Sequence, residues 1–409
     1  MAKQEGKLNR ELGLGDVIMF GVGGIVGAGI YAIIGEAAGL AGNMLWLSFA
    51  IAAGVALLTG MAYAEFVSQF PDAGGSFEYI KQSFSEKTAL RLSGIMLFTG
   101  IIAPAAIAIS FSDYLGRLLE VPHWITTIGI VVFMSLINII GAKESSWFNS
   151  LATIITLLGL GSVIWFALPS WGEADLLALP ETGPRGLFLG SALIFFSYVG
   201  FEDLVKMAEE VKMPEKTMPR GILISGVLVL IIYVLIAISS VNVMDPQELA
   251  ESKGPLAQVL ETVAGKAWVT GLVVVALFAT SKTILSNILG SSRLLFDIAR
   301  DSNITWMQKL TQVDEKRNTP TFAIIAIGIL VVAFSLIGNL KVVASMSNIF
   351  VFILFITVNI ALLRFRKTHT KGSSAPFRIP LNINNYPLPT LIAIIGLMVL
   401  LVFNIHNLF

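Results

Sequence analysis

Eleven long apolar runs divide this chain of 409 residues. A helix needs about 20 mostly apolar residues to cross the hydrocarbon core of a bilayer. In lipid, such a segment must satisfy its backbone hydrogen bonds internally, which favours the α-helix. We therefore predict an all-α integral membrane protein with about 11 transmembrane helices. The runs cover residues 13–39, 41–69, 92–115, 124–141, 147–168, 186–205, 220–243, 267–292, 321–338, 342–363 and 387–406.

The composition supports this class and excludes several others. Only 13% of the residues are charged, against about 25% in soluble domains. The chain has no cysteine, so disulfides, thiolate metal sites and cysteine nucleophiles are excluded. The three histidines lie far apart in the sequence, and no GxxxxGK[ST] phosphate loop is present. We expect no enzymatic activity, no cofactor, no metal site and no nucleic-acid partner.

Lysine and arginine are distributed unevenly between the two sets of alternate loops. The set that includes the N-terminus holds most of them, and Lys282 belongs to neither set. Cytoplasmic loops carry the excess of positive charge. We predict a cytoplasmic N-terminus and, after eleven crossings, a C-terminus outside, in the plasma or inner membrane. The opposite set of loops holds only Arg117, Arg185, Lys253, Lys266 and Lys341.

The first run contains an unusual density of glycine. Residues 21–30 read "GVGGIVGAGI", although each glycine costs about 1 kcal/mol relative to alanine in a helix interior. One interpretation is close helix packing through a small-xxx-small pattern. The other is an interrupted helix, which exposes free amides on one half and free carbonyls on the other. Such amides suit an anionic group, and the carbonyls suit a cation.

The sixth run has a comparable feature. Residues 194–203 read "IFFSYVGFED", passing from apolar residues through Ser197 and Gly200 into two acids. The second irregular span comes five crossings after the first, so two five-helix halves would be opposite in orientation, as in inverted-repeat transporters. We predict discontinuous helices 1 and 6. The predicted organisation is a cytoplasmic tail (1–10), two repeats (11–168 and 185–363) and an additional C-terminal helix (386–406).

Four long segments, in this order, resemble the amino acid–polyamine–organocation (APC) superfamily of secondary transporters. The resemblance runs from about residue 12 to about residue 389. It implies an amino acid permease built as a 5+5 inverted repeat. The segments are "LGLGDVIMFGVGGIVGAGIY" (12–31), "YAEFVSQFPDAGGSFEYI" (63–80), "FFSYVGFEDLVKMAEEVKMPEKTMPRGI" (195–222) and "ALFATSKTILSNILGSSRLLFDIARD" (276–301).

The resemblance also implies a substrate site made of backbone. In this superfamily the first helix unwinds at a Gly-small-Gly signature, whose amides hold the substrate carboxylate. Here the signature is Gly27, Ala28 and Gly29. Main-chain carbonyls before it and in the unwound sixth helix hold the substrate amino group. The corresponding residues are Ile25, Phe196 and Val199.

Lys282 lies deep inside the eighth span, and an ionisable residue at such a depth is a functional candidate. In sodium-coupled relatives of this fold, an Ala-x-x-(Thr or Ser)-(Thr or Ser) pattern in the eighth helix helps coordinate sodium. Ala279, Lys282 and Thr283 have this spacing. We hypothesise that the Lys282 ammonium replaces the sodium and contacts carbonyls near Gly23 and Val26. Alternatively, Lys282 is a structural charge that never titrates.

In many proton-coupled relatives, a lysine of the fifth helix takes the place of the sodium ion. This chain has Thr156 at the approximate position instead. Glu202 is a second coupling candidate, and its alternative role is to cap a helix end. Glu65 and Asp113 are interpreted as structural residues at span ends.

Three further residues are candidates for shaping or gating the pocket. Tyr198 follows the aromatic start of the unwound sixth segment. Ala103 and Pro104 lie in the third span, which shapes the side-chain pocket in this superfamily. Residues 71–76, "PDAGGS", indicate a cytoplasmic re-entrant or gating turn, or an ordinary loop.

The expected function is secondary transport of an amino acid by alternating access. The leading form is proton-coupled uptake of a zwitterionic α-amino acid. The alternatives are uncoupled exchange of amino acids or amines (including polyamines and cationic amino acids), with Lys282 as a fixed charge, and a nutrient sensor without transport. The expected partners are the substrate, the lipid bilayer and, for the coupled form, protons. The oligomeric state is left open.

Overall fold

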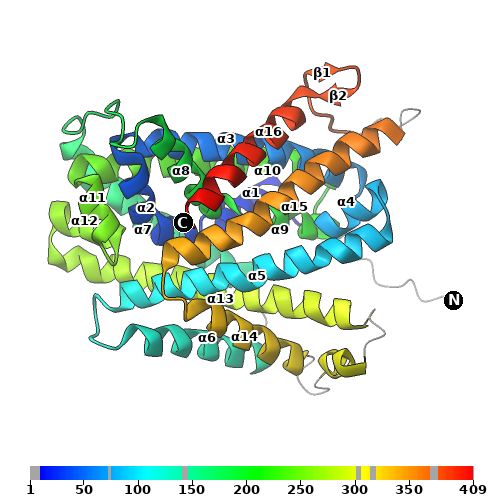
Figure 1. Ribbon diagram of the computed structural model, residues 1–409, viewed down its shortest axis with the longest axis horizontal. Helices are drawn as coiled ribbons and strands as arrows, with labels where there is room; N and C mark the ends of the chain where they lie inside the picture. Colours follow the sequence, from blue (N-terminus) through cyan, green and yellow to red (C-terminus); the bar gives the residue numbers. More distant parts are fainter. Residues whose placement is uncertain are drawn as a thin grey trace.

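The computed structural model describes residues 10–71, 75–140, 146–300, 305–313, 319–368 and 376–408. Within these ranges, long helices lie beside one another with their axes aligned roughly along one direction (Figure 1). The strands of the described part form a single short hairpin, β1 (Asn382–Ile383) with β2 (Tyr386–Pro387). The all-α class is confirmed.

The predicted crossings agree with the helices. In the described residues, nine segments are long and apolar enough to cross a membrane, and one of them, Ala28–Gln69, has the length of two crossings. In chain order the crossings are α1 (Leu14–Ile25) with α2 (Ala28–Ala41); α3 (Leu45–Gln69); α5 (Glu86–Leu115); α6 (His123–Ile140); α7 (Ser146–Ala167); α8 (Pro184–Ile194) with η3 (Phe195–Tyr198), α9 (Phe201–Leu204) and η4 (Val205–Glu210); α10 (Pro214–Val243); α13 (Lys266–Arg300); α14 (Thr321–Ser335); α15 (Leu340–Thr368); and α16 (Leu388–His406).

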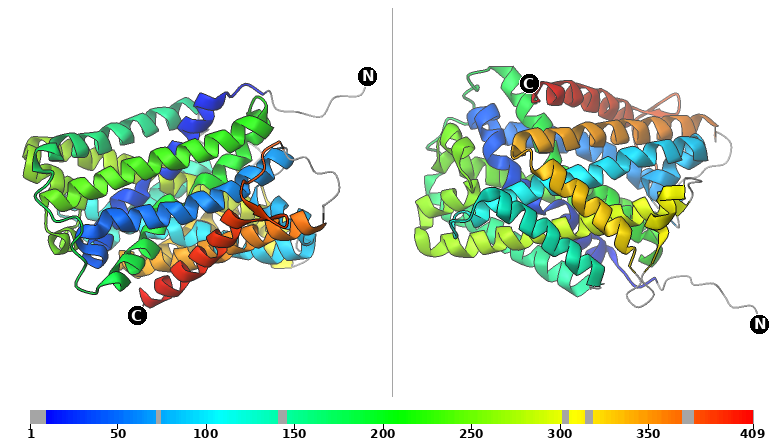
Figure 2. Two further views of the ribbon diagram at one scale, coloured as in Figure 1. Left: turned by 90° about the horizontal axis from the view of Figure 1, so that it is seen from above. Right: turned by 60° about the horizontal axis from the view of Figure 1, so that its bottom comes forward.

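Short elements cover the two ends of the bundle. α4 (Ser76–Ser83) and the β hairpin lie at one end, and α11 (Pro246–Glu251) and α12 (Pro255–Ala264) lie at the other (Figures 1 and 2). The remaining short helices are η1 (Gly42–Met44), η2 (Leu168–Ser170) and η5 (Thr305–Thr311). Residues 72–74 of the predicted gating turn lie outside the described residues.

The helix-packing pattern repeats when each crossing is replaced by the one that lies five places away in the other half of the chain. Crossing 1 packs on crossing 7 (α1 on α10), and crossing 6 packs on crossing 2 (α8 on α3). Crossing 3 packs on crossing 10 (α5 on α15), and crossing 8 packs on crossing 5 (α13 on α7). Two repeats related by a pseudo-two-fold axis would produce this pattern. The packing therefore supports two repeats, whose bounds at 11–168 and 185–363 stay a prediction.

A buried ion pair fastens the bundle at the end that carries the hairpin. Arg366 of α15 lies 2.5 Å from Glu65 of α3, and the two side chains are 5% and 2% exposed. The backbone N–H of Ile379 also donates to Glu65 Oε2 at 2.9 Å. Asn385 donates to the carbonyl of Arg366 at 3.0 Å. Glu65 thus has the structural role expected of it, tying α3 to α15 and the hairpin.

Candidate functional site

The first span is interrupted, as predicted. α1 ends at Ile25 and α2 begins at Ala28, while Val26 and Gly27 leave helical geometry with ψ angles of 78° and −139°. The Gly27 N–H donates to the carbonyl of Ile25 at 2.9 Å, and no side chain caps the N-terminus of α2. The first N–H groups of a helix have no intrahelical partner and favour a negative group.

The second interruption is longer. After Ile194 the sixth span narrows into the 3₁₀ helix η3, extends at Val199 and turns at Gly200, whose φ is +137°. This φ is rarely compatible with a side chain. The chain then resumes as the short α9 and η4. The prediction of a discontinuous helix 6 is confirmed.

The two interruptions touch each other. A Cβ added to Gly200 would lie 2.5 Å from the Gly24 carbonyl oxygen, and one added to Gly29 would lie 2.8 Å from the Cα of Ser197. Both distances are too short for real atoms, so the backbones approach closely only because these residues are glycine. The packing and interruption interpretations of the first run are therefore both valid, at different glycines.

Ser197 brings a polar side chain to this contact. Its residue is 1% exposed, and within the described part of the chain its Oγ has no hydrogen-bond partner. A buried hydroxyl without a partner is unusual. Its Oγ would lie 3.3 Å from a Cβ on Gly29, in the first turn of α2. A hydroxyl and uncapped helix amides thus converge where an anionic group would be favoured.

Tyr233 of α10 joins both interruptions and was missed by the sequence analysis. Its buried hydroxyl lies 3.1 Å from the carbonyl of Ile25 and 3.3 Å from the carbonyl of Ser197. The signal in the sequence was a tyrosine in an apolar span, because a buried phenol usually finds a partner. Ile25 O also accepts the Gly27 N–H, so both of its lone pairs are engaged when the single Tyr233 proton points to it rather than to Ser197. A substrate amine at Ile25 would have to displace one donor.

The predicted coupling site lies on α13 beside the first interruption. Thr283 Oγ1 lies 3.0 Å from the position of a Cβ on Gly27, so α13 does reach the first interruption. Thr283 itself donates to the Ala279 carbonyl at 2.8 Å. Lys282 is half-buried on the same turn of α13. Its contact with carbonyls near Gly23 and Val26 stays a prediction.

The fifth helix brings Thr153 to the first interruption. A Cβ on Gly23 would lie 2.1 Å from Thr153 Oγ1, so Thr153 packs against that glycine. The carbonyl of Thr156, one turn later, accepts from the hydroxyl of Tyr31 at 3.4 Å. The correspondence of Thr156 to the lysine of proton-coupled relatives stays a prediction.

Glu202 turns back towards the second interruption. Its Oε2 accepts the N–H of Gly200 at 2.8 Å, which is the capping arrangement considered as the alternative. Asp203 pairs with Lys206 at 2.5 Å on the exposed side. Capping and proton coupling are compatible, so the coupling role of Glu202 stays a prediction.

The remaining predicted residues surround the interruptions at varying distance. Phe196 is buried in η3, and Val199 is the extended residue after it. The hydroxyl of Tyr198 donates to the Phe49 carbonyl at 3.2 Å, away from the α2 terminus. α5 continues through Ala103 and the buried Pro104, and it packs on α2, α13 and α15.

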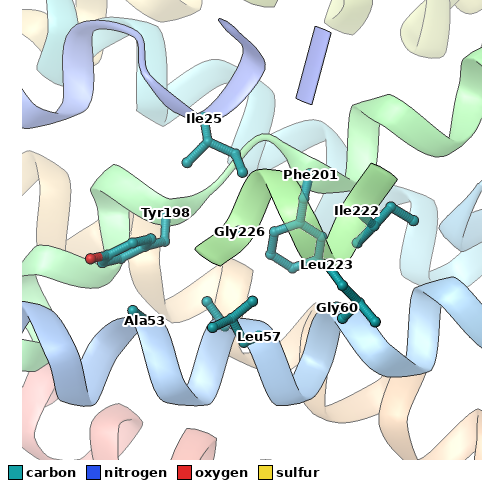
Figure 3. A pocket seen from close by; sticks show the side chains of 10 residues that line it. Ile25, Ala53, Leu57, Gly60, Tyr198, Phe201, Ile222, Leu223 and Gly226 are labelled. Carbon is teal, nitrogen blue, oxygen red and sulfur yellow. The ribbon is translucent and has the colours of Figure 1, made fainter. Parts of the chain in front are cut away.

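An apolar cavity lies behind the interruptions, between α3 and α10 (Figure 3). With its opening it has an empty volume of about 320 Å³. Ile25, Tyr198 and Phe201 belong to the broken spans, and the other residues belong to α3 and α10. Its lining comprises Ile25, Ala53, Ala56, Leu57, Gly60, Tyr198, Phe201, Ile222, Leu223 and Gly226.

Sequence comparison assigns the chain to a family. The family described as amino acid permease matches residues 12–408. The cationic amino acid transporter 7, chloroplastic, of Arabidopsis thaliana is 29% identical over 91% of this chain and 68% of its own. The branched-chain amino acid permease BcaP of Bacillus subtilis is 27% identical over 89% and 82%. Cationic amino acid transporter 1 of Arabidopsis thaliana is 26% identical over 91% and 65%. The resemblance to the APC superfamily is thereby confirmed, and this multi-pass membrane protein belongs to the amino acid permease family.

Proposed function

We propose that this chain carries an α-amino acid across the plasma membrane by alternating access. The observation that carries the proposal is the meeting of the two interrupted spans. There the uncapped amides at the start of α2 and the partnerless Ser197 hydroxyl converge. A carboxylate placed there gains charge-assisted hydrogen bonds in a buried region. Ala28 and Gly29 supply amides directly, and Gly27 joins them when its N–H leaves the Ile25 carbonyl.

The amino group of the substrate would then face carbonyl oxygens. The end of α1 and the irregular segment 195–200 leave carbonyls outside regular helical bonding. Phe196 and Val199 are the proposed ligands in the sixth span. Ile25 joins them when its bond with Tyr233 exchanges for one with the substrate. The carboxylate of an amino acid thus matches the amide end of a half-helix, and its ammonium group matches a carbonyl end.

The chemistry of the side chain sets the proposed substrate class. The printed names of relatives include both cationic and branched-chain amino acid carriers. The wall next to the interruptions is apolar, built from Ile25, Phe201 and the α3 and α10 residues (Figure 3). An apolar wall favours an uncharged side chain, because burying an unpaired cation is costly. We therefore favour a neutral zwitterionic amino acid.

The proposed mechanism is proton-coupled symport, in which a proton gradient drives uptake. Lys282 lies on α13 next to Thr283, which contacts the first interruption. An ammonium there would repel a sodium ion and could take its place. Uncoupled exchange with Lys282 as a permanent charge is the competing mechanism.

The test is uptake into proteoliposomes. Labelled leucine, lysine and arginine are offered with and without an inward proton gradient to wild type, Lys282→Ala and Lys266→Ala. Lys266 begins the same helix at an exposed position, so it controls for loss of a positive charge. We expect leucine to accumulate in response to the gradient with wild type and Lys266→Ala, and not with Lys282→Ala.

Other outcomes contradict separate parts of the proposal. Exchange without any response to the gradient would refute proton coupling. Uptake of lysine and arginine in preference to leucine would refute the neutral substrate. Absence of flux for all three would refute the carrier function.

A further inference from the structure

The end of α8 needs hydrogen-bond donors that its own chain does not supply in regular form. A residue in an α-helix accepts from the N–H four positions later. α8 changes to the narrower η3 after Ile194. The Phe195 N–H donates to the carbonyl of Ser191 in the regular way and also to that of Leu193, so the regular pattern ends within the last carbonyls of the helix. Those of Ala192 and Leu193 lie directly before the interruption that contains Ser197.

Asn348 supplies these donors from another helix. It lies in α15 with no exposed surface. Its Nδ2 donates to the Ala192 carbonyl at 2.8 Å and to the Leu193 carbonyl at 3.3 Å. One amide nitrogen carries two N–H groups, so a single side chain serves both carbonyls. Asn348 thereby closes the last turn of α8 across a sequence distance of 156 residues.

The other atom of the same amide indicates why asparagine is present. Asn348 Oδ1 is buried without a hydrogen-bond partner among the described residues. A buried acceptor without a partner is unfavourable, and leucine would fill similar space without it. The Nδ2 donors are therefore the feature of Asn348 that the structure uses.

Asn407 makes a comparable bond further from the interruption. It follows α16 and donates to the Leu189 carbonyl of α8 at 3.0 Å. Asn404 of α16 donates to the Ser345 carbonyl of α15 at 2.7 Å. These bonds dock α16 on α8 and α15, which lie next to it (Figure 1). Leu189 is almost a full turn before Ala192, so its bond does not close the broken end.

We propose that Asn348 is a positioning residue for substrate binding. Its amide fixes the last turn of α8, and hence the place at which Ser197 presents its hydroxyl to the N-terminus of α2. The inference rests on the proposed function, because it assumes that the Ser197 hydroxyl and the α2 amides bind the substrate carboxylate. Loss of the amide donors would misplace Ser197 and weaken binding without blocking the transport cycle.

The experiment compares Asn348→Leu with Asn407→Leu, which removes the same kind of bond to the same helix. Binding and transport of labelled leucine or lysine, whichever wild type accumulates, are measured on purified protein and in proteoliposomes. We expect Asn348→Leu to raise Kd and KM by about tenfold with Vmax within about twofold, as for loss of one or two net hydrogen bonds. Asn407→Leu should change Kd and KM less than about threefold. Asn348→Gln, which keeps an amide donor, should recover part of the affinity.

A structural role alone would produce a different pattern. If both leucine variants lose thermal stability and neither changes Kd, the positioning role is refuted while the proposed function stands. Equal losses of affinity in both variants would also refute it. If Asn348→Leu does not fold, Asn348→Ser replaces it, with the same expected rise in Kd. Failure of wild type to bind either amino acid refutes the proposed function itself.

Discussion

The two interrupted spans reach the same place by different means. The first breaks over two residues, Val26 and Gly27, and depends on the absence of side chains along α1 and α2. The second is irregular from η3 to η4, and donors from elsewhere support it: Asn348 at Ala192, and Tyr233, which the second span shares with Ile25 of the first. A short break made by glycine is encoded locally, whereas a long break needs partners from distant helices.

We expect the first span to be the fixed part of the binding surface and the sixth span to be the adjustable part. The amides of α2 belong to a regular helix that is fully buried over most of its length. The sixth span contacts α10 and α15 through single hydrogen-bonding side chains, Tyr233 and Asn348. Substitutions at matched positions in the two spans test this contrast.

Gly200→Ala should have the largest effect. Its φ of +137° and the Gly24 carbonyl 2.5 Å from an added Cβ both oppose a side chain. Strain at such a residue is about 1–3 kcal/mol, and the clash with backbone adds to it. We expect that the variant shows no measurable uptake. The protein that does fold should have a lowered melting temperature. Wild-type uptake by Gly200→Ala would show that the spans do not touch during transport.

Gly29→Ala should reduce transport nearly as much as Gly200→Ala does. It should not weaken the helix itself. Alanine is about 1 kcal/mol better than glycine in a helix interior, so any loss must arise from the contact with Ser197 Cα at 2.8 Å. We expect at least a tenfold fall in kcat/KM, about 1.4 kcal/mol. Gly54→Ala in α3, where an added Cβ meets nothing within 4 Å, serves as the control and should transport normally.

Tyr233→Phe should have an intermediate effect on both spans at once. The variant keeps the ring, which packs with Phe49 and Tyr198, and removes the hydroxyl shared by Ile25 and Ser197. Hydrogen bonds within membrane proteins contribute about 0.6 kcal/mol on average and up to about 1.7. We therefore expect a threefold to tenfold change in Kd, measured by equilibrium binding.

Tyr114→Phe is the matched control for this hydroxyl. Tyr114 is equally buried and donates to the carbonyl of Tyr31, inside the regular part of α2, at 3.3 Å. An equal change of Kd in both variants would contradict a special role for the bond that joins the interruptions.

Glu202→Gln should have the smallest effect on binding. Glutamine retains an oxygen that can accept the Gly200 N–H, so capping survives and Kd should change by less than about twofold, well below the cost of losing a helix cap. Glu202→Ala removes the cap and should weaken binding further. If Glu202→Gln binds normally but no longer accumulates substrate in response to a proton gradient, then Glu202 has a coupling role besides capping.

Much of the fold could be predicted from the sequence because its signals are local. The apolar run length is set by the thickness of the bilayer, so the predicted crossings and the observed helices agree closely. The glycines of the first span and the Ser-x-x-Gly of the sixth predicted both interruptions, because these signals are also local in the sequence. The family resemblance predicts a substrate-binding role for Gly27, Ala28 and Gly29; they lie at the start of α2, and that role stays a prediction.

The side chains that hold the site together were not predictable in this way. Tyr233 contacts a residue 208 positions away, and Asn348 one 156 positions away. The contact of Thr153 with Gly23 was not predictable either, since the rotation of one apolar helix against another depends on all of their contacts. The sequence by itself determined where the chain crosses the membrane and where it breaks. Only the tertiary structure decided which distant donors satisfy the broken ends, because a backbone group that loses its local partner accepts one from whichever helix packs beside it.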